Sequence, residues 1–520
     1  MRARISYIPI TIFLVLCSMH SVSADDALQW GIDQGRNRIA DEKNLPVFFE
    51  AGRRDPVTNE IVEPGPNVRW AARIGSRTYT PPVVAEGRVL IGTNNDVLFE
   101  PEIEGDQGVM LCLDEKTGKF LWQHTAPKVK GIKFFDTEMI GITSTPTVRN
   151  GRVWFVDNRG TVCALKLSDG SPIWILDLVE TFGVRQHDAN NCSIVVHEGL
   201  LYLGTANGQD DRHQDVERPE APSFLVLDAE TGRALARDAH WLKTGIAHGQ
   251  WCSPCLGEVR NVDGNHVWTI FYVLGNGVLH AMKTLNRNEL LKKAPAMGDY
   301  GEFGSKLAQI EPDWIFNGNG AEIFGEEKPF QVGRGSASFV CLPPPIFVDN
   351  RLYLLFCIDA TTGARPHRAF MTAFDPSLLG RDPNSPGRSP RLQSRLQWKT
   401  PMIEKGVLSP QAVSGGLLYF GDRNGGFYCL DAENGETLWK LDLKGEHWGG
   451  PLVADGKIYI GTNRRMFYVL REGRESEILA EIEMPDAIYA GATAANGTLF
   501  VPGNGFLYAI EELRPQESAR

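Results

Sequence analysis

The phrase CLDAENGETLW occupies residues 429–439, and almost the same phrase, CLDEKTGKFLW, occupies residues 112–122. In both, an alternating strand ends at an aspartate, a turn ends at a glycine, and a second strand carries a tryptophan four residues after that glycine. The aspartate can accept backbone N–H bonds and the glycine supplies a positive φ, so the phrase predicts a β-hairpin. The residues that define this hairpin are Asp114, Gly118 and Trp122 in the first copy, Asp431, Gly435 and Trp439 in the second, and Gly170 and Trp174 in a third.

Two further strand-like stretches precede each hairpin, such as LSPQAVSG at residues 408–415 and LLYF at residues 417–420. Four strands joined by turns in about forty residues are typical of one β-propeller blade. The third strand of this unit recurs eight times, at residues 111–114, 163–166, 225–228, 280–283, 372–375, 428–431, 468–471 and 508–511. The sequence therefore predicts an all-β fold, an eight-bladed β-propeller of four-stranded antiparallel blades.

The eighth copy has no outer strand of its own after residue 511. Residues 67–74 (NVRWAARI) resemble an outer strand with Trp70 in the tryptophan position, so we expect them to complete the last blade and close the ring. The predicted propeller spans residues 67–512. The remaining segments are a leader at residues 1–24, a polar lead-in at residues 25–66 that we expect on the outside of the ring, and a polar tail at residues 513–520.

The first 24 residues have the pattern of a secretory signal peptide. Arg2 and Arg4 form a basic start, residues 5–16 are apolar but too short to span a bilayer, and small residues lead up to Ala24. We therefore expect cleavage near Ala24 and export to the periplasm or the extracellular space. No other apolar run approaches the length of a membrane-spanning helix.

The 520-residue chain is acidic, with a formal net charge of -11. An acidic chain without a basic stripe argues against nucleic acid as the main partner. Eight cysteines remain beyond the leader, but the chain has too many apolar residues to be a disulfide scaffold. Composition is that of an ordinary globular protein, which we expect to be a monomer.

The blade pattern is a strand ending in Ala-Leu-Asp or Cys-Leu-Asp, with a glycine four residues and a tryptophan eight residues after the aspartate. It resembles the tryptophan-docking repeat of pyrroloquinoline-quinone (PQQ) propellers. It is similar to the repeats of quinoprotein alcohol dehydrogenases and of BamB-type assembly lipoproteins, over most of residues 67–512. In quinoprotein dehydrogenases, calcium and PQQ lie on the propeller axis, carboxylates and an amide hold the calcium, an aspartate acts as base, and a disulfide joins adjacent cysteines.

Several of those features are missing from this sequence. It contains no adjacent cysteine pair, and Leu256 follows CSPC at residues 252–255, where a haem site would need histidine. No local motif matches the calcium and catalytic carboxylates. The resemblance therefore implies the fold, and we expect no cofactor, with PQQ and calcium as the alternative that the resemblance leaves open.

Long connections on one face of the ring are the expected binding surface, because loops on a rigid scaffold usually carry function. Polar and aromatic residues at the ends of second strands or just before inner strands should converge there. The candidate ligand-binding residues are Asp157, His187, Asp188, Asn190, His248, Trp251, Arg334, Asp359 and Asp422. They could supply a base, an orienting carboxylate and a cation, although a solvated polar rim explains the same pattern.

Two functions fit these observations. The favoured hypothesis is an exported, non-catalytic propeller that binds a protein, a glycan or a small ligand on its long-loop face. The alternative is a periplasmic PQQ-dependent, quinoprotein alcohol dehydrogenase-like oxidoreductase. A hydrolase is a third class, but no nucleophile motif supports it.

Cys192 and Cys252 occupy the same position of adjacent predicted inner strands. Inner strands of neighbouring blades approach each other near the axis, so a Cys192–Cys252 disulfide is one hypothesis. Two free buried thiols are the favoured alternative. For Trp122, Trp174 and Trp439 we likewise favour packing between blades over stacking on a ligand.

Overall fold

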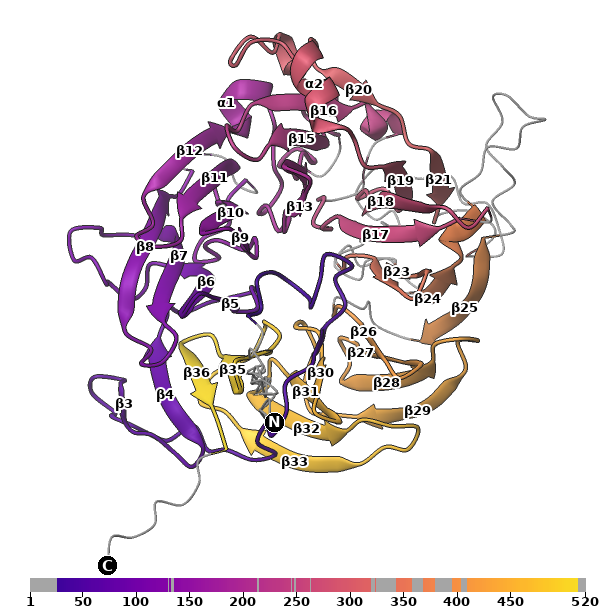
Figure 1. Cartoon of the computed structure of the whole chain (residues 1–520). Helices are drawn as coiled ribbons and strands as arrows, with labels where there is room; N and C mark the ends of the chain where they lie inside the picture. Colours follow the sequence, from indigo (N-terminus) through magenta and orange to yellow (C-terminus); the bar gives the residue numbers. More distant parts are fainter. Residues whose placement is uncertain are drawn as a thin grey trace, which may run out of the picture.

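The computed structural model describes residues 26–129, 131, 135–212, 215–244, 246, 249–261, 263–318, 323, 343–357, 368–378, 395–403 and 409–512. Eight antiparallel sheets of four strands form a ring, and two of them gain a fifth, parallel strand (Figure 1). The predicted eight-bladed all-β propeller is therefore confirmed.

The first four blades follow one another along the chain, each written from its inner to its outer strand. Blade 1 is β5 (Val83–Ala85), β6 (Arg88–Asn94), β7 (Gln107–Asp114) and β8 (Phe120–Pro127). Blade 2 is β9 (Thr147–Arg149), β10 (Arg152–Val156), β11 (Thr161–Lys166) and β12 (Pro172–Asp177). Blade 3 is β13 (Val195–His197), β14 (Leu200–Gly204), β15 (Phe224–Asp228) and β16 (Ala234–Asp238), with β20 (Ala308–Ile310) on its outer edge. Blade 4 is β17 (Cys255–Arg260), β18 (His266–Val273), β19 (Val278–Lys283) and β21 (Trp314–Asn317).

The remaining four blades complete the circle. Blade 5 is β22 (Ile346–Val348), β23 (Arg351–Cys357), β24 (Arg368–Phe374) and β25 (Leu396–Ile403). Blade 6 is β26 (Ala412–Ser414), β27 (Leu417–Gly421), β28 (Gly426–Asp431) and β29 (Thr437–Asp442). Blade 7 is β30 (Leu452–Ala454), β31 (Lys457–Gly461), β32 (Met466–Arg471) and β33 (Ile478–Glu483), with β1 (Ile39–Ala40) on its inner edge. Blade 8 is β34 (Thr493–Ala495), β35 (Thr498–Pro502), β36 (Phe506–Ile510) and β4 (Val68–Arg73).

Few of the helices and strands in the described residues lie outside the blades. They are the hairpin of β2 (Arg53–Arg54) and β3 (Ile61–Glu63), the helices α1 (Leu178–Phe182) and α2 (Arg287–Lys293), and the 3₁₀ turns η1 (Trp241–Thr244), η2 (Glu302–Gly304) and η3 (Pro376–Leu378). Within the described ranges, no helix combines the length and apolarity that crossing a membrane would require.

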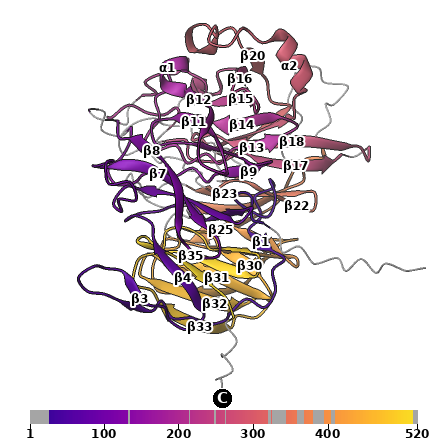
Figure 2. The ribbon, with the colours of Figure 1, turned by 60° about the vertical axis from the view of Figure 1, so that its left-hand side comes forward.

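Strand β4 closes the ring as predicted. It pairs antiparallel with β36, placing Trp70 opposite Ala509 and Arg73 opposite Phe506. Figure 2 shows β4, in indigo, beside the yellow C-terminal strands. Because this pairing covers the outer edge of β36, the last blade is joined from both ends of the propeller sequence.

The repeated tryptophans pack between neighbouring blades. The Trp122 indole N–H donates to the Leu167 carbonyl oxygen at 3.0 Å, and its ring covers Gly170 of the next blade. A Cβ at Gly170 would lie 2.6 Å from a ring atom of Trp122, so the turn needs glycine for space as well as for its φ of 71°. Equivalent indole bonds reach the carbonyl oxygens of Glu115 from Trp70, Ala229 from Trp174, Ala432 from Trp398 and Gly473 from Trp439.

Part of the lead-in departs from our expectation, because residues 26–40 run around the inside of the ring and do not pack on its outside. Figure 1 shows this axial segment, in indigo, crossing the centre. It accepts one hydrogen bond from a backbone N–H of the inner strand of each of blades 1 to 7, in chain order, five through carbonyl oxygens and two through the side-chain oxygens of Gln34 and Asn37. The seven donors are the N–H groups of Val84, Val148, Val196, Leu256, Phe347, Val413 and Val453.

Two consecutive polar side chains of the axial segment reinforce this arrangement. Arg36 is fully buried and donates to the carbonyl oxygens of Pro254 and Ser193 at 2.9 and 2.7 Å. The Asn37 side chain donates to the Val413 carbonyl oxygen at 2.8 Å and accepts from the Val413 N–H at 2.9 Å. Apart from β1 beside blade 7, the inner strands have no further described strand on their axial side, so this segment satisfies backbone groups that would otherwise need water.

Candidate functional site

A funnel opens on the axis at the long-loop face, where the inner strands begin. Six residues, each four positions before the first residue of an inner strand, line one cavity of about 400 Å³. They are Tyr79 (blade 1), Thr143 (blade 2), Asn191 (blade 3), Trp251 (blade 4), Trp448 (blade 7) and Tyr489 (blade 8). The equivalent positions of blades 5 and 6 lie outside the described residues. The propeller geometry therefore brings one residue per blade to a common wall.

Three of these side chains form an aromatic cluster. The ring centroids of Tyr79 and Tyr489 lie 5.5 Å apart, those of Trp448 and Tyr489 also 5.5 Å, and those of Tyr79 and Trp448 6.2 Å. The Arg423 guanidinium lies 5.4 Å from the Trp448 ring centroid, within cation–π range. All four side chains are half-buried, so the cluster presents aromatic faces and a cation to the funnel.

The floor of the funnel comes from the axial segment. Arg38 is buried, donates to the Pro451 carbonyl oxygen at 3.2 Å and to the Ala492 carbonyl oxygen at 2.6 Å, and lines the cavity together with Trp30. Burial lowers the pKa of Arg38 to about 10, which still leaves the guanidinium charged at neutral pH.

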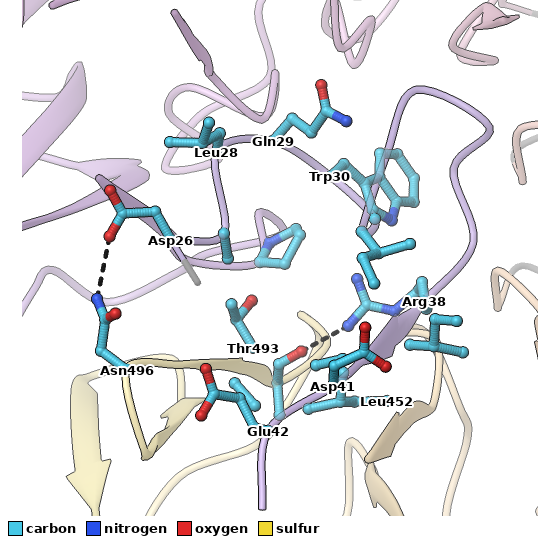
Figure 3. A pocket seen from close by; sticks show the side chains of 18 of the residues that line it. Asp26, Leu28, Gln29, Trp30, Arg38, Asp41, Glu42, Leu452, Thr493 and Asn496 are labelled. Carbon is cyan, nitrogen blue, oxygen red and sulfur yellow. Dashed lines mark hydrogen bonds between the residues drawn. The ribbon is translucent and has the colours of Figure 1, made fainter. Parts of the chain in front are cut away.

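Below this floor lies a second cavity of about 650 Å³, also lined by Trp30 and Arg38 (Figure 3). Its other lining residues include the acidic side chains of Asp26, Asp41 and Glu42. The axial segment thus separates a basic, aromatic funnel from a more acidic cavity at the short-turn face.

The wall opposite the aromatic cluster carries two of the residues singled out from the sequence. Asp188 and Trp251 both line the funnel. Asp188 adopts a left-handed backbone with a φ of 65°, and its Oδ1 accepts from the Thr137 hydroxyl at 3.3 Å. The Trp251 indole N–H donates to the His187 carbonyl oxygen at 3.0 Å, which fixes its ring against the wall.

His187 and Asn190 lie behind this wall. His187 is fully buried and its Nδ1 lies 3.1 Å from the Gln209 carbonyl oxygen. Its Nε2 is 4.0 Å from Asp188 Oδ2. Asn190 is also buried, and its Oδ1 accepts from the Cys192 N–H at 3.0 Å. Both side chains therefore support the backbone that positions Asp188.

Asp157 and Asp422 cap turns. Asp422 Oδ1 accepts from the N–H groups of Asn424 and Gly426 at 2.7 and 2.8 Å, and the Tyr428 hydroxyl donates to Oδ2 at 2.8 Å. Asp157 Oδ1 makes the same pair of backbone contacts in blade 2. Neither is among the residues that line the funnel. The other three candidates, His248, Arg334 and Asp359, lie outside the described residues.

The hypothesis of a Cys192–Cys252 disulfide is wrong and the favoured alternative is confirmed, because both cysteines are free buried thiols. Cys192 Sγ accepts from the Gly204 N–H at 3.1 Å, whereas Cys252 Sγ contacts the Pro343 carbonyl oxygen at 3.7 Å. The two sulfur atoms thus contact different backbone groups and not each other. Burial raises the pKa of both to about 12, so neither carries the thiolate that disulfide exchange requires at neutral pH.

Sequence reasoning missed Tyr79, Arg423, Trp448 and Tyr489. A usable signal was present: Tyr79, Thr143, Asn191, Trp448 and Tyr489 each lie eight positions before the glycine of the first turn, for example 87 minus 79. Aligning the repeats on that glycine would have gathered the funnel residues in one column.

A family model described as "Outer membrane protein assembly factor BamB" matches residues 63–269 and 389–476. The chain belongs to this BamB family. One BamB relative, from Moranella endobia (strain PCIT), is 28% identical over 245 residues, which are 42% of this chain and 58% of the relative. The matched part thus spans little more than half of that relative's length.

Solved structures share the fold. BamB from Moraxella catarrhalis aligns with a TM-score of 0.51 and 12% identity, over 85% of this chain and 99% of that one. The quinohemoprotein alcohol dehydrogenase from Comamonas testosteroni aligns with a TM-score of 0.51 and 13% identity, over 95% and 82%. At these identities the alignments show the fold alone, and they include both a BamB protein and an oxidoreductase.

The funnel is a poor match for the calcium and PQQ of quinoproteins. Calcium takes six to eight oxygen ligands, with carboxylates prominent among them. The described lining offers one carboxylate, Asp188, and it places the guanidinium groups of Arg38 and Arg423 around the same cavity. These cations oppose a divalent ion, so the residues present do not fit the group and no reaction step is derived through it.

Proposed function

We propose that this BamB-family chain is an exported, non-catalytic scaffold that binds an extended segment of a partner protein in the axial funnel. The observation that carries the proposal is the lining itself. Tyr79, Trp448, Tyr489 and Trp251 surround a concave site with Arg423 at its edge. Tryptophan, tyrosine and arginine are the residue types that dominate binding energy at protein interfaces.

Charge defines the kind of segment that would fit. The chain as a whole is acidic, yet the charged side chains that line the described part of the funnel are two arginines and one aspartate, Arg38, Arg423 and Asp188. A partner segment with an aromatic or aliphatic anchor and an acidic group would complement both the rings and the guanidinium groups. The family description, an assembly factor, favours such a protein partner over a glycan or a small ligand.

Site-specific photo-crosslinking tests the proposal. A photoreactive amino acid at Tyr489 should capture a discrete partner protein, whereas the same group at Ile478, an exposed residue of the outer strand β33, should not. A synthetic peptide of the crosslinked segment should then bind the purified chain. Tyr489→Ala and Arg423→Ala should each weaken that binding about tenfold or more, and Ile478→Ala should leave it unchanged.

Two results would count against the proposal. One is a peptide that binds the unchanged chain and the Tyr489→Ala, Arg423→Ala and Ile478→Ala variants equally, because the interface would then lie away from the funnel. The other is stoichiometric binding of PQQ with calcium together with dye-linked alcohol oxidation, which would favour the oxidoreductase alternative.

Export is part of the same proposal. It is supported by the basic, apolar and small-residue pattern of residues 1–24. N-terminal sequencing of the protein recovered from the periplasm should begin near Asp25. A chain that starts at Met1 in the cytoplasmic fraction would contradict it.

A further inference from the structure

Away from the funnel, three metal-ligating side chains meet where blade 1 touches blade 2. His124 comes from the outer strand β8, whereas Asp157 and Cys163 belong to blade 2. His124 Nε2 lies 3.7 Å from Asp157 Oδ2 and 3.7 Å from Cys163 Sγ. All three potential ligand atoms lie within 4.8 Å of one another.

These distances approach those of a tetrahedral zinc site. With Zn–S near 2.3 Å and Zn–N or Zn–O near 2.0–2.2 Å, ligand atoms stand about 3.3 to 3.6 Å apart. The observed separations exceed that by a few tenths of an ångström for the two contacts of His124. We propose that His124, Asp157 and Cys163 bind one Zn²⁺ ion between blades 1 and 2.

Asp157 is already prepared for this role. Its Oδ1 accepts from the N–H groups of Arg159 and Thr161 at 2.8 and 3.0 Å, which fixes the carboxylate plane. Its Oδ2 lies 3.7 Å from His124 Nε2, and only 4% of the Asp157 side chain is exposed. A buried carboxylate is costly unless it is paired or bound to a metal, so an ion between these groups would stabilise it.

Blade 6 provides an internal comparison. Asp422 makes the same turn, but six residues later (428 minus 422) stands Tyr428, whose hydroxyl donates to Asp422 Oδ2 at 2.8 Å. In blade 2 the residue six positions after Asp157 (163 minus 157) is Cys163. The aspartate that a tyrosine satisfies in one blade therefore faces a thiol in the other.

The third ligand is also specific to this junction. His124 follows the docking tryptophan of blade 1 by two positions (124 minus 122), and in blade 5 the same position holds Thr400 (400 minus 398). The His124 side chain is 21% exposed, so an ion can reach the cluster from that side and keep a water molecule as its fourth ligand.

Binding involves no change of oxidation state. The Cys163 thiol loses its proton to solvent, a sulfur–zinc bond forms, and the hydrated ion releases water. Because a thiol must lose its proton to bind zinc, zinc binding at pH 7.5 should release about one proton.

The experiment uses the purified reduced chain, stripped with EDTA and titrated with ZnCl₂ against a chromophoric chelator. We expect one Zn²⁺ per chain, one proton released in calorimetry with two different buffers, and a thiolate-to-cobalt absorption band with Co²⁺. His124→Gln and Cys163→Ala should each weaken zinc binding by at least about 100-fold. Cys429→Ala, which removes another buried third-strand thiol, should leave it unchanged.

His124→Gln alters a partly exposed strand position, so it keeps the test decisive if Cys163→Ala fails to fold. Absence of zinc binding below about 10 µM would overturn the proposal and leave a simple histidine–carboxylate pair. Zinc binding that persists in both His124→Gln and Cys163→Ala would overturn it as well, because the ion would then be held by other surface groups.

Discussion

The docking of Trp122 on Gly170 can be tested with two matched glycine substitutions in blade 2. Gly170 has a φ of 71°, and Gly151, in the first turn of the same blade, has a φ of 68°. An added Cβ at Gly170 would meet the Trp122 ring at 2.6 Å, whereas at Gly151 it would meet no atom within 4 Å. The two substitutions therefore differ mainly in that collision.

The magnitudes follow from this difference. An alanine forced into the left-handed region costs about 1 to 2 kcal/mol at either position. Overpacking against a buried ring adds about 1 to 3 kcal/mol at Gly170 alone. We expect Gly151→Ala to lower the free energy of unfolding by about 1 kcal/mol and Gly170→Ala by about 3 kcal/mol.

Urea unfolding followed by circular dichroism measures both changes, and a double-mutant cycle isolates the contact. In a Trp122→Ala background the ring is gone, so Gly170→Ala should then cost no more than Gly151→Ala. Equal costs for the two glycine substitutions in the otherwise unchanged chain would refute the reasoning, since the ring would not be what requires glycine at the turn.

Further predictions concern the axis and the buried ionisable groups. Asn37→Ala removes a paired hydrogen bond to an inner strand of blade 6 and should lower the free energy of unfolding by about 2 to 4 kcal/mol, whereas Gln107→Ala, which removes one exposed contact, should change it by less than about 0.5 kcal/mol in urea titrations. Burial lowers the pKa of His280 from 6.5 to about 4, so the unfolded chain binds one more proton than the folded chain between these pH values. The free energy of unfolding should therefore fall by about 3 kcal/mol from pH 6.5 to pH 4. His280→Phe should flatten this part of the plot of unfolding free energy against pH. Cys192 and Cys252 should not react with a thiol reagent at pH 8 in the folded chain, and both should react after unfolding in guanidinium. A thiol count in guanidinium that is two lower than expected would instead support the Cys192–Cys252 disulfide.

The fold could be predicted because every blade encodes its own turns. The aspartate-to-glycine turn, the tryptophan and the alternating strands are local signals, so eight repeats sum to a ring. Even the closing strand was predictable, since Trp70 marks residues 67–74 as an outer strand without its own blade. These features depend on contacts within a blade or between neighbouring blades.

The course of the lead-in could not be predicted from local pattern. Arg36, Asn37 and Arg38 are polar, and such a run normally indicates a solvated surface. They become buried because the closed ring presents inner-strand backbone groups that lack partners. Those groups come from blades separated by up to several hundred residues, so nothing in the segment itself reveals them.

The candidate site was predicted in part for a related reason. Asp188 and Trp251 reach the funnel, but His187 is held behind the wall, and the Asp157 and Asp422 side chains are used in local turns. Short polar side chains after a strand serve turn geometry as readily as ligands, and sequence spacing alone does not separate these roles.

A comparison of the repeats within this chain separates the positions that hold the fold from those that form the binding surface. Inner strands keep an apolar residue, such as Val84, Val148 or Val453, at the position whose N–H meets the axial segment. Five positions earlier the residue changes from blade to blade, and the corresponding residues are Tyr79, Thr143 and Trp448. The backbone of each of these inner strands therefore donates a hydrogen bond to the axial segment, and the residue five positions earlier presents a variable side chain to the funnel. Because the backbone is held from below by the axial segment, substitutions at the variable position can change what the funnel binds without loosening the ring, so binding specificity in this propeller should reside in that position.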